Sequence, residues 1–411
     1  MQKEIECNKE RLICLYLLYD GKQSKVYKTL NTTTNEIYAT KMIERKNLNV
    51  QRKIDYIYSE YCMYHLLSFD NIIHLKKEMF TTKNNYYFIL EYCNGQSLAH
   101  FKKEYENRNK QKLNEFYIKK LLNQIIKGLF FLHSKYFIHR DIKLQNIFIN
   151  FDEFPPTVEK EDYSKFNLDQ KFSIRIGDFG FAKLLSEGKK TFSKVGTHFT
   201  AAPEVINSNG KGYNEKADLW SLGAITYDLI IGYDHNDEEI INKLEKGIFY
   251  IPNHKKISVE IIHFISGLLH PNPNKRFDWE KIKSHPFITN DEKNFKYINI
   301  ETINNEDLEI DCTQEMSLIK DKLKINKDYS IWDLYINNNK LTDKIQILEQ
   351  TLIQKENLIK NYELAFSKFK TEFINITKKE DLKNESFEII ESIDDSEDDD
   401  FLIFIKYKNN H

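Results

Sequence analysis

The sequence predicts an α+β protein in which a small strand-rich unit precedes a larger helical unit. Up to about residue 95, short runs of apolar, β-branched and aromatic residues have the composition of β-strands, and they lie at 11–19, 24–30, 36–43 and 86–93. From about residue 110 onward, the apolar residues recur at helical spacing instead. This change of period separates the two units.

Helical spacing also predicts where the main helices lie. One helix interrupts the strands within residues 51–68, where the spaced apolar residues are Ile54, Ile57, Tyr61, Tyr64 and Leu67. Residues 114–134 place five apolar residues on one helical face, namely Ile118, Leu121, Leu122, Ile125 and Leu129. Further helices are expected within 216–231 and 258–269, and compact order is expected to end near Ile288.

Composition excludes several classes of protein. The 411 residues carry a formal net charge of −2, which argues against binding of nucleic acid or anionic membrane through bulk charge. The charged start of the chain is unlike a secretory signal, and no apolar run is long enough to span a bilayer. The five cysteines form no C-x-x-C pair, as in reducing compartments. We therefore expect a cytoplasmic protein with no nucleic-acid partner and no membrane span.

The most specific segment is "IHRDIKLQNIFI", residues 138–149. Its polar residues match H-R-D-x-K-x-x-N in full and are His139, Arg140, Asp141, Lys143 and Asn146. The apolar runs on both sides indicate a short loop between two buried strands. With this segment the sequence resembles the protein kinase family.

Other motifs of that family follow in the required order. "DFG" supplies Asp178 to Gly180, "APE" supplies Ala202 to Glu204, and "DLWSLG" supplies Asp218, Trp220 and Gly223. The resemblance implies an ion pair between Arg276 and Glu204, and a second between Lys41 of "YATKMI" and the helix residue Glu60. It covers about residues 12–288 and implies the two-lobed protein kinase fold, with a small β-rich lobe and a large helical lobe.

The resemblance also implies the chemistry, which is transfer of the γ-phosphoryl group of ATP to Ser or Thr of protein substrates with Mg²⁺ as cofactor. Asp141 is expected to accept the proton of the substrate hydroxyl, and Lys143 to add positive charge at the phosphoryl group. Lys41, fixed by Glu60, should position the phosphates, while Asn146 and Asp178 offer Mg²⁺ oxygen ligands. The expected nucleotide-binding residues are Leu18, Gly21, Ser24, Val26, Ala39, Lys41, Glu91, Cys93 and Phe148, with Leu90 as gatekeeper.

The glycine-rich loop departs from the family pattern. In "LLYDGKQSKVYK", only Gly21 remains, because Tyr19 and Ser24 stand where the other two glycines are expected. This departure motivates a pseudokinase scaffold as the main alternative, which the intact catalytic set argues against. A small-molecule kinase would lack the A-P-E and D-x-W-S-x-G motifs, and a purely structural coiled-coil protein would not need the catalytic residues.

Two further segments carry predictions about regulation. The linker between Asn146 and Asp178 is roughly twenty residues longer than kinases usually need and predicts an exposed insertion, either neutral or used for partner docking. Phosphorylation of the activation segment, residues 186–198, is expected to control activity. The expected phosphorylation sites are Ser193 first and Thr191 next, and the phosphate would bind a cationic pocket formed by Arg140 and Lys183.

"DFGFAK" and "YNEKADLWSLGAITY" resemble the ULK-type, autophagy-initiating kinases.

The C-terminal third predicts an interaction region. After a linker at 289–330, residues 331–378 repeat apolar residues every 3.5 positions, with Ile359 and Phe366 at a and Tyr362 and Phe369 at d. That stripe suits a coiled coil, as in a homodimer, or an amphipathic helix packed on the kinase. Residues 379–411 predict a disordered acidic tail. Within it, Phe387 and Ile390 form an aromatic-x-x-aliphatic pattern that could add a strand to a ubiquitin-like autophagy protein.

Overall fold

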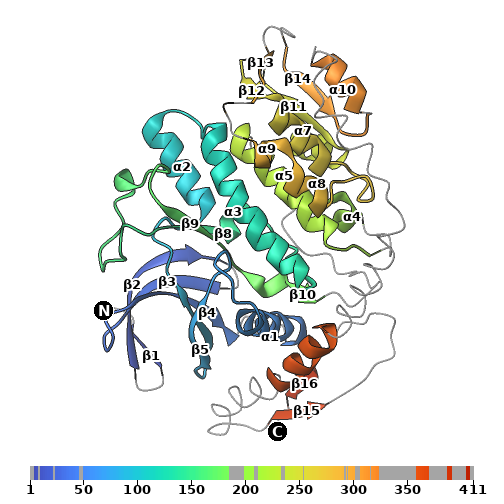
Figure 1. Ribbon diagram of the computed structural model, residues 1–411. Coiled ribbons are helices and arrows are strands. Elements are labelled where there is room, and N and C mark those ends of the chain that lie inside the picture. The colour runs from blue at the N-terminus through green and yellow to red at the C-terminus, as the bar shows by residue number, and fades with distance from the viewer. Residues whose placement is uncertain are drawn as a thin grey trace. The chain divides into compact units, whose positions relative to one another are not determined.

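The computed structural model begins with a six-stranded antiparallel sheet, whose strands lie in the order β1-β2-β3-β4-β6-β5 (Figure 1). The strands are β1 (Glu4–Cys7), β2 (Glu10–Asp20), β3 (Ser24–Asn31), β4 (Ile37–Glu44), β5 (Leu75–Thr81) and β6 (Asn85–Glu91). The structure describes residues 4–7, 10–21, 24–45, 50–184, 199–207, 212–232, 237–252, 254–290, 293, 295–300, 306–314, 316–323, 358–369, 387–390 and 404–407.

The chain divides into two units, and the predicted α+β organisation is confirmed. The β-rich unit contains Met1–Phe101, Ile147–Ala182 and Leu358–His411, and the helical unit contains Lys102–Asn146 and Lys183–Asn357. The four predicted strands correspond to β2, β3, β4 and β6. The other two, β1 and β5, were not predicted, because β1 is only four residues long and β5 is interrupted by Lys76, Lys77 and Glu78.

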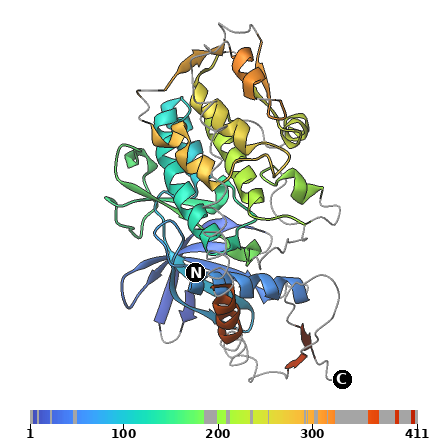
Figure 2. The ribbon, with the colours of Figure 1, turned by 45° about the vertical axis from the view of Figure 1, so that its right-hand side comes forward.

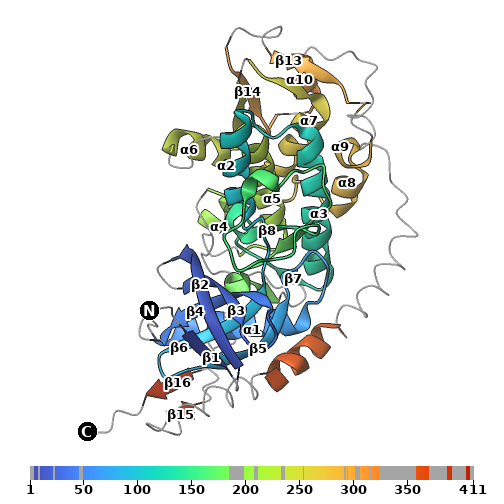
Figure 3. The same cartoon turned by 90° about the vertical axis from the view of Figure 1, so that its left-hand side faces the viewer.

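Side chains from the strands form the core of the β-rich unit. Tyr86 to Leu90 are all buried, so β6 is covered on both faces and reads as a continuous apolar run. The predicted helix, α1 (Val50–Leu66), belongs to the same unit and buries Ile57, Tyr61 and Tyr64. Figure 3 shows the strands of this sheet together with α1. The unit also contains the paired strands β8 (Ile147–Phe151) and β9 (Phe172–Ile176), and the short turns η3 (Tyr163–Lys165) and η4 (Phe179–Phe181).

The helical unit is built on three helices that carry its core. In α3 (Glu115–Ser134), all five residues predicted for the buried face are fully buried, and the Asn114 side chain caps the helix by accepting the Tyr117 N–H. α5 (Lys216–Ile230) and α7 (Val259–Leu268) are buried almost all round. The remaining helices are α2 (Leu98–Asn109), which begins in the β-rich unit, α4 (Pro203–Ile206), α6 (Glu238–Glu245), α8 (Trp279–Ser284), α9 (Pro286–Thr289) and α10 (Met316–Lys322). No helix in the described ranges is both long and apolar enough to cross a membrane.

Part of the predicted linker, 289–330, belongs to the helical unit. β13 (Tyr297–Asn299) pairs with β12 (Lys256–Ser258), and β14 (Leu308–Asp311) pairs with β11 (Ile248–Ile251). These pairings bury Ile300, Leu308 and Ile310, so the apolar content of this range is used in packing. The unit also contains β7 (Phe137–Ile138), which pairs with β10 (Lys183–Leu184), and the turn η2 (Leu144–Asn146).

The C-terminal region is described in three short pieces. Residues 358–369 form a helix that carries four positions of the predicted heptad, and the rest of the heptad lies outside the described residues. In the predicted acidic tail, β15 (Phe387–Ile390) pairs antiparallel with β16 (Phe404–Tyr407). The remainder of that tail is also outside the described part of the chain.

The insertion between β8 and β9 is exposed over much of its length, but it is anchored at two points. Phe166 and Leu168 are buried, and the Phe166 ring stacks on Phe151 with centroids 4.6 Å apart. Further back, the Glu161 carboxylate pairs with the fully buried Lys28 ammonium of β3 at 2.6 Å. Tyr92 donates its hydroxyl to the same carboxylate oxygen at 2.9 Å.

Lys28 has a full set of partners at this anchor. Its ammonium donates to the Tyr16 hydroxyl at 2.8 Å, to the Glu159 carbonyl at 2.9 Å and to Glu161, which accounts for all three protons. Burial lowers the pKa of Lys28, and Glu161 opposes that shift. The insertion therefore supplies the counter-charge for a cation buried under the sheet.

We predict that Glu161→Gln destabilises the β-rich unit by roughly 3 kcal/mol, because it leaves a buried ammonium without a counter-charge. Thermal unfolding of the full chain measures the effect. Glu159→Gln is the matched control, since Glu159 makes its hydrogen bonds to Lys28 and Tyr16 through its backbone carbonyl. Adding Lys28→Met to Glu161→Gln should recover part of the loss, because neither charge then remains. Equal melting temperatures for the two single variants would contradict the anchor.

We also predict a pH-dependent stability of the helical unit that originates at Glu115. Burial raises the pKa of this carboxyl to about 7, and only one of its oxygens accepts a hydrogen bond among the described residues, from the Ser258 N–H at 2.8 Å. Because the folded-state pKa exceeds the unfolded one, the carboxyl's contribution is fully present below its ordinary pKa and is lost as the pH rises through about 7.

Glu115→Gln should remove this pH-dependent loss of stability, because the glutamine amide cannot ionise and its oxygen can still accept the Ser258 N–H. The variant should match the wild type near pH 4 and exceed its free energy of unfolding at pH 8 by up to about 3 kcal/mol. Denaturant unfolding followed by tryptophan fluorescence reports on this unit, which contains Trp220 and Trp279. A stability difference that is the same at both pH values would refute the assignment.

Candidate active site

The central polar contact of the β-rich unit joins β4 to α1. Lys41 Nζ lies 2.8 Å from both carboxylate oxygens of Glu60, so the predicted ion pair is present. The Glu60 side chain is only 2% exposed, and the Tyr64 hydroxyl donates to it at 3.0 Å. A carboxylate at this depth requires a paired charge, which fixes α1 against β4.

Asp178 completes this group of charges. Its Oδ1 lies 2.9 Å from Lys41 Nζ, and 41% of its side chain is exposed. Burial alone would lower the pKa of Lys41, but the carboxylates of Asp178 and Glu60 raise that pKa above its ordinary value. Lys41 therefore keeps its positive charge throughout the physiological range.

The residues around Asp178 hold it in an uncommon backbone conformation. Its φ of 65° lies in the left-handed region, which costs a non-glycine residue free energy unless the surroundings impose it. The next residue, Phe179, is fully buried and packs edge-on against the Tyr64 ring at 5.5 Å. The Ser59 hydroxyl donates to the Ala182 carbonyl at 2.9 Å. Contacts with α1 therefore fix the backbone that follows Asp178.

The predicted nucleotide-binding residues gather on neighbouring strands of the same unit. Val26 on β3 lies directly opposite Lys41, and Ala39 lies opposite the buried Leu90 on β6, the predicted gatekeeper. Ala39 and Lys41 are two residues apart on β4 and therefore share one face of the sheet. The other members are Leu18 on β2, Ser24 at the start of β3, Glu91 at the end of β6, Cys93 just after it and Phe148 on β8.

Gly21 lies in the turn after β2, where its N–H donates to the Ser24 carbonyl at 3.0 Å. A Cβ at this position would come within 2.5 Å of the Tyr19 ring. The exposed Tyr19 ring, which stands where another glycine of the loop is expected, would have to rotate away to admit a side chain at this position.

The segment that joins β6 to α2 is fixed by residues that the sequence analysis did not single out. Glu91 accepts the His74 N–H at 2.8 Å and pairs with Arg175 of β9 at 3.1 Å. Tyr92 is held by Glu161 of the insertion, and Cys93 is buried. No local pattern could have indicated Arg175 or Glu161, since both partners lie far away along the chain.

The helical unit holds the second set of predicted catalytic residues. Lys143 Nζ lies 2.7 Å from Asp141 Oδ2, and Asn146 donates its amide to the same carboxylate oxygen and to the Asp141 carbonyl at 2.9 Å. Asp141 and Asn146 are both buried. Because the Asn146 amide nitrogen turns to Asp141, its amide oxygen faces away from that carboxylate.

A buried carboxylate on α5 shapes this loop. The Asp218 carboxylate accepts hydrogen bonds from the backbone N–H groups of His139 and Arg140 at 2.8 Å each. It makes a third hydrogen bond of the same length to Nε2 of the His133 ring. Burial alone would raise the pKa of Asp218, but the interactions with His133 and His139 hold it below its ordinary value. Arg140 is thereby kept at a φ of 69° next to Asp141. The sequence matched Asp218 to a motif without indicating this anchoring contact.

The predicted pair between Arg276 and Glu204 is also confirmed. The guanidinium makes two hydrogen bonds to the carboxylate, at 2.8 and 3.0 Å, and its side chain is fully buried over the Trp220 ring. The predicted phosphosites Ser193 and Thr191 lie outside the described residues. Lys183 pairs with Ile138 in the β10–β7 ladder, so the chain brings it near Arg140.

Comparison with known proteins agrees with these motifs. Residues 16–288, more than half of the chain, match the protein kinase domain. The chain is 30% identical over 264 residues to a probable cell cycle serine/threonine-protein kinase CDC5 homolog of Encephalitozoon cuniculi, covering 63% of this chain and 51% of that protein. It is 31% identical over 290 residues to CBL-interacting serine/threonine-protein kinase 20 of Arabidopsis thaliana, covering 69% and 58%.

A third relative is the serine/threonine-protein kinase ATG1 of Debaryomyces hansenii, 27% identical over 298 residues, with 66% of this chain and 33% of that protein covered. The chain spans about half the length of the curated relatives it matches. The family match and the motifs together identify the chain as a member of the protein kinase family.

Proposed function

We propose that this protein transfers the γ-phosphoryl group of ATP to serine and threonine residues of protein substrates. The observation that carries the proposal is the formed Lys41–Glu60 pair with Asp178 bound to the same lysine. Lysine at position 143 is the pattern of serine/threonine kinases. Incubation of the purified chain with radiolabelled ATP and peptide libraries that offer Ser, Thr or Tyr tests it. Transfer only to Tyr, or none at all, would overturn it.

Protein kinases generally use ATP and Mg²⁺, and the residues here fit both. Asp178 offers an accessible carboxylate and Asn146 an amide oxygen; these are the hard oxygen ligands that Mg²⁺ prefers. Mg²⁺ is commonly held by one or two protein groups together with substrate phosphates. Lys41 would bind the α- and β-phosphates. When bound, the metal ion neutralises charge on the phosphate oxygens.

The remaining roles belong to the helical unit. Asp141 would accept the proton of the substrate hydroxyl, because its carboxylate is held in place by Asn146 and Lys143. Lys143 would then place its positive charge at the transferring phosphoryl group. The Tyr19 and Ser24 departures motivated a pseudokinase alternative, but every residue needed for transfer is present, and no observation favours a scaffold without activity.

Regulation by phosphorylation of the activation segment forms part of this proposal. Arg140 follows β7 by two residues and Lys183 begins β10, the strand paired with β7; two cations in these places support a site for a phosphate group. The tail pattern at Phe387 and Ile390 supports a further proposal, a ubiquitin-like partner that pairs with this strand. A homodimer through the heptad remains a prediction of the sequence.

We predict that Asp141→Asn lowers kcat by about 100-fold or more, because the amide cannot accept the substrate proton. Binding of MgATP, measured by calorimetry, should stay close to that of the wild type, since the proton is accepted only during transfer. Asp152→Asn, an exposed carboxylate in the insertion, is the matched control. Turnover by Asp141→Asn at the wild-type rate would remove this residue from the mechanism.

We predict that Ser193→Ala combined with Thr191→Ala reduces activity, because Arg140 and Lys183 then have no phosphate partner to order the segment. Mass spectrometry of the active wild type should find phosphate on Ser193 or Thr191. The measurement is the initial rate of peptide phosphorylation before and after phosphatase treatment. A double variant as active as the wild type, and a wild type that phosphatase does not affect, would exclude this switch.

A further inference from the structure

The helix at residues 358–369 is amphipathic, and its apolar side is covered. Ile359 is 6% exposed, and Tyr362, Phe366 and Phe369 are partly buried on the same side of the helix. Leu364, on the other side, is 72% exposed. The helix belongs to the β-rich unit and lies beside α1 in both Figure 1 and Figure 2.

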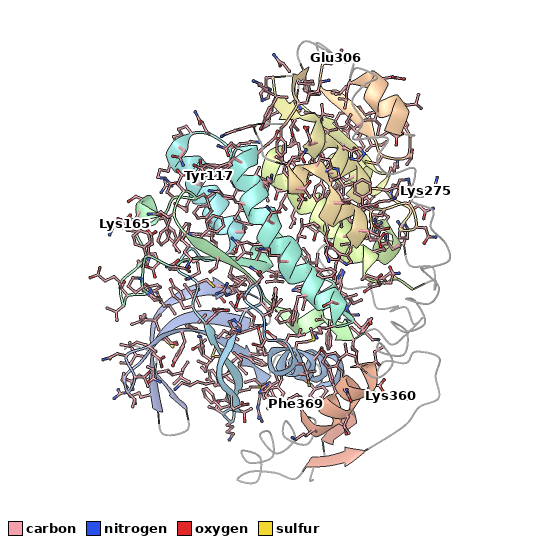
Figure 4. All side chains as sticks on the ribbon, in the orientation of Figure 1. Tyr117, Lys165, Lys275, Glu306, Lys360 and Phe369 are labelled. Carbon is pink, nitrogen blue, oxygen red and sulfur yellow. The ribbon has the colours of Figure 1, made fainter. Side chains whose placement is uncertain are left out.

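Aromatic contacts join this helix to α1. Phe366 packs edge-on against Tyr58 with ring centroids 6.2 Å apart, and the Tyr58 hydroxyl donates to the Phe366 carbonyl. Phe369, labelled in Figure 4, packs edge-on against Tyr61 at 6.2 Å and lies 5.0 Å from the His65 ring. Tyr58, Tyr61 and His65 are spaced three and four residues apart and therefore form one stripe along α1.

A different face of α1 carries the catalytic contacts. Glu60 binds Lys41, Tyr64 packs on Phe179, and Ser59 binds the Ala182 carbonyl. One helix of 17 residues therefore connects two sets of interactions: the C-terminal helix on one side, and Lys41 with the Asp178 segment on the other. The position of α1 decides whether the Lys41–Glu60 pair can form.

We propose that residues 358–369 act as a built-in activating element that docks through Phe366 and Phe369 onto Tyr58, Tyr61 and His65 and thereby positions Glu60 for Lys41. The proposal rests on the kinase function for its activity readout, but the docking itself does not. Phe366 and Phe369 are positioning residues, because they would act on Glu60 through their contacts with α1.

The structure indicates that docking of residues 358–369 raises activity and does not lower it. The helix is docked while the Lys41–Glu60 pair is formed at 2.8 Å and Phe179 is buried against Tyr64. A contact that opposed activity would be expected to accompany a broken pair. Docking and the paired arrangement therefore favour each other, and removing one weakens the other.

The first test compares full-length variants. Phe366→Ala combined with Phe369→Ala should lower kcat for casein phosphorylation by about tenfold, because a larger fraction of the molecules then lacks the Lys41–Glu60 pair. Leu364→Ala, which removes an exposed apolar side chain from the same helix, should leave kcat unchanged. Equal or higher activity in the double variant overturns the proposal.

A second readout does not depend on activity. Hydrogen exchange of the α1 amides from Ser59 to Tyr64 should become faster in the double variant and remain unchanged in Leu364→Ala. Unchanged α1 protection in the double variant overturns the docking, whether or not the chain phosphorylates casein. Loss of protection in a chain that has no kinase activity would instead count against the proposed function alone.

Rescue in trans separates positioning from simple stability. A synthetic peptide of residues 358–369, added to the double variant, should restore α1 protection and casein phosphorylation together. The same peptide with both phenylalanines replaced by alanine is the control and should restore neither. Restored protection with no gain in activity would show that the helix stabilises α1 without positioning Glu60, which overturns the proposal.

Discussion

Burial of the Glu60 carboxylate against Lys41 is the interaction on which the β-rich unit depends. A carboxylate that is 2% exposed is stable only with its counter-charge in place, and removing either partner would leave the other charge unpaired. This requirement fixes the register of β4, the position of α1 and, through Tyr64 and Phe179, the backbone at Asp178. Chemistry and architecture are therefore set by the same contact.

Buried charges also join distant parts of the chain at two other places. Lys28 and Glu161 are separated by 133 residues, and Asp218 holds the His139 N–H from 79 residues away. Apolar packing tolerates small displacements, whereas a buried charge requires a partner in one geometry. These buried charges therefore help to fix where the insertion and the loop that carries Asp141 are attached. The apolar core around them supplies most of the remaining stability.

Local patterns predicted what local interactions determine. The buried face of α3, the strands β2, β3, β4 and β6, and the ion pairs at Glu60 and Glu204 all followed from spacing or motif, and the structure confirms them. Sequence could not predict the Glu161 anchor, the Arg175–Glu91 pair or the use of Asp218, because each joins segments that no periodicity connects. The strands β13 and β14 were missed for a related reason, since three or four residues carry too little pattern to show pairing.

The C-terminal stripe shows the same limit and has a mechanistic consequence. A 3.5-residue repeat of apolar positions suits a second helix of any origin, so sequence alone left a coiled coil and a helix packed on the kinase equally open. In the structure, the stripe positions at Phe366 and Phe369 contact α1. One apolar face cannot serve two partners at once. A coiled-coil partner that bound these two phenylalanines would therefore compete with α1 for them. Such competition would couple the oligomeric state of this chain to the position of Glu60.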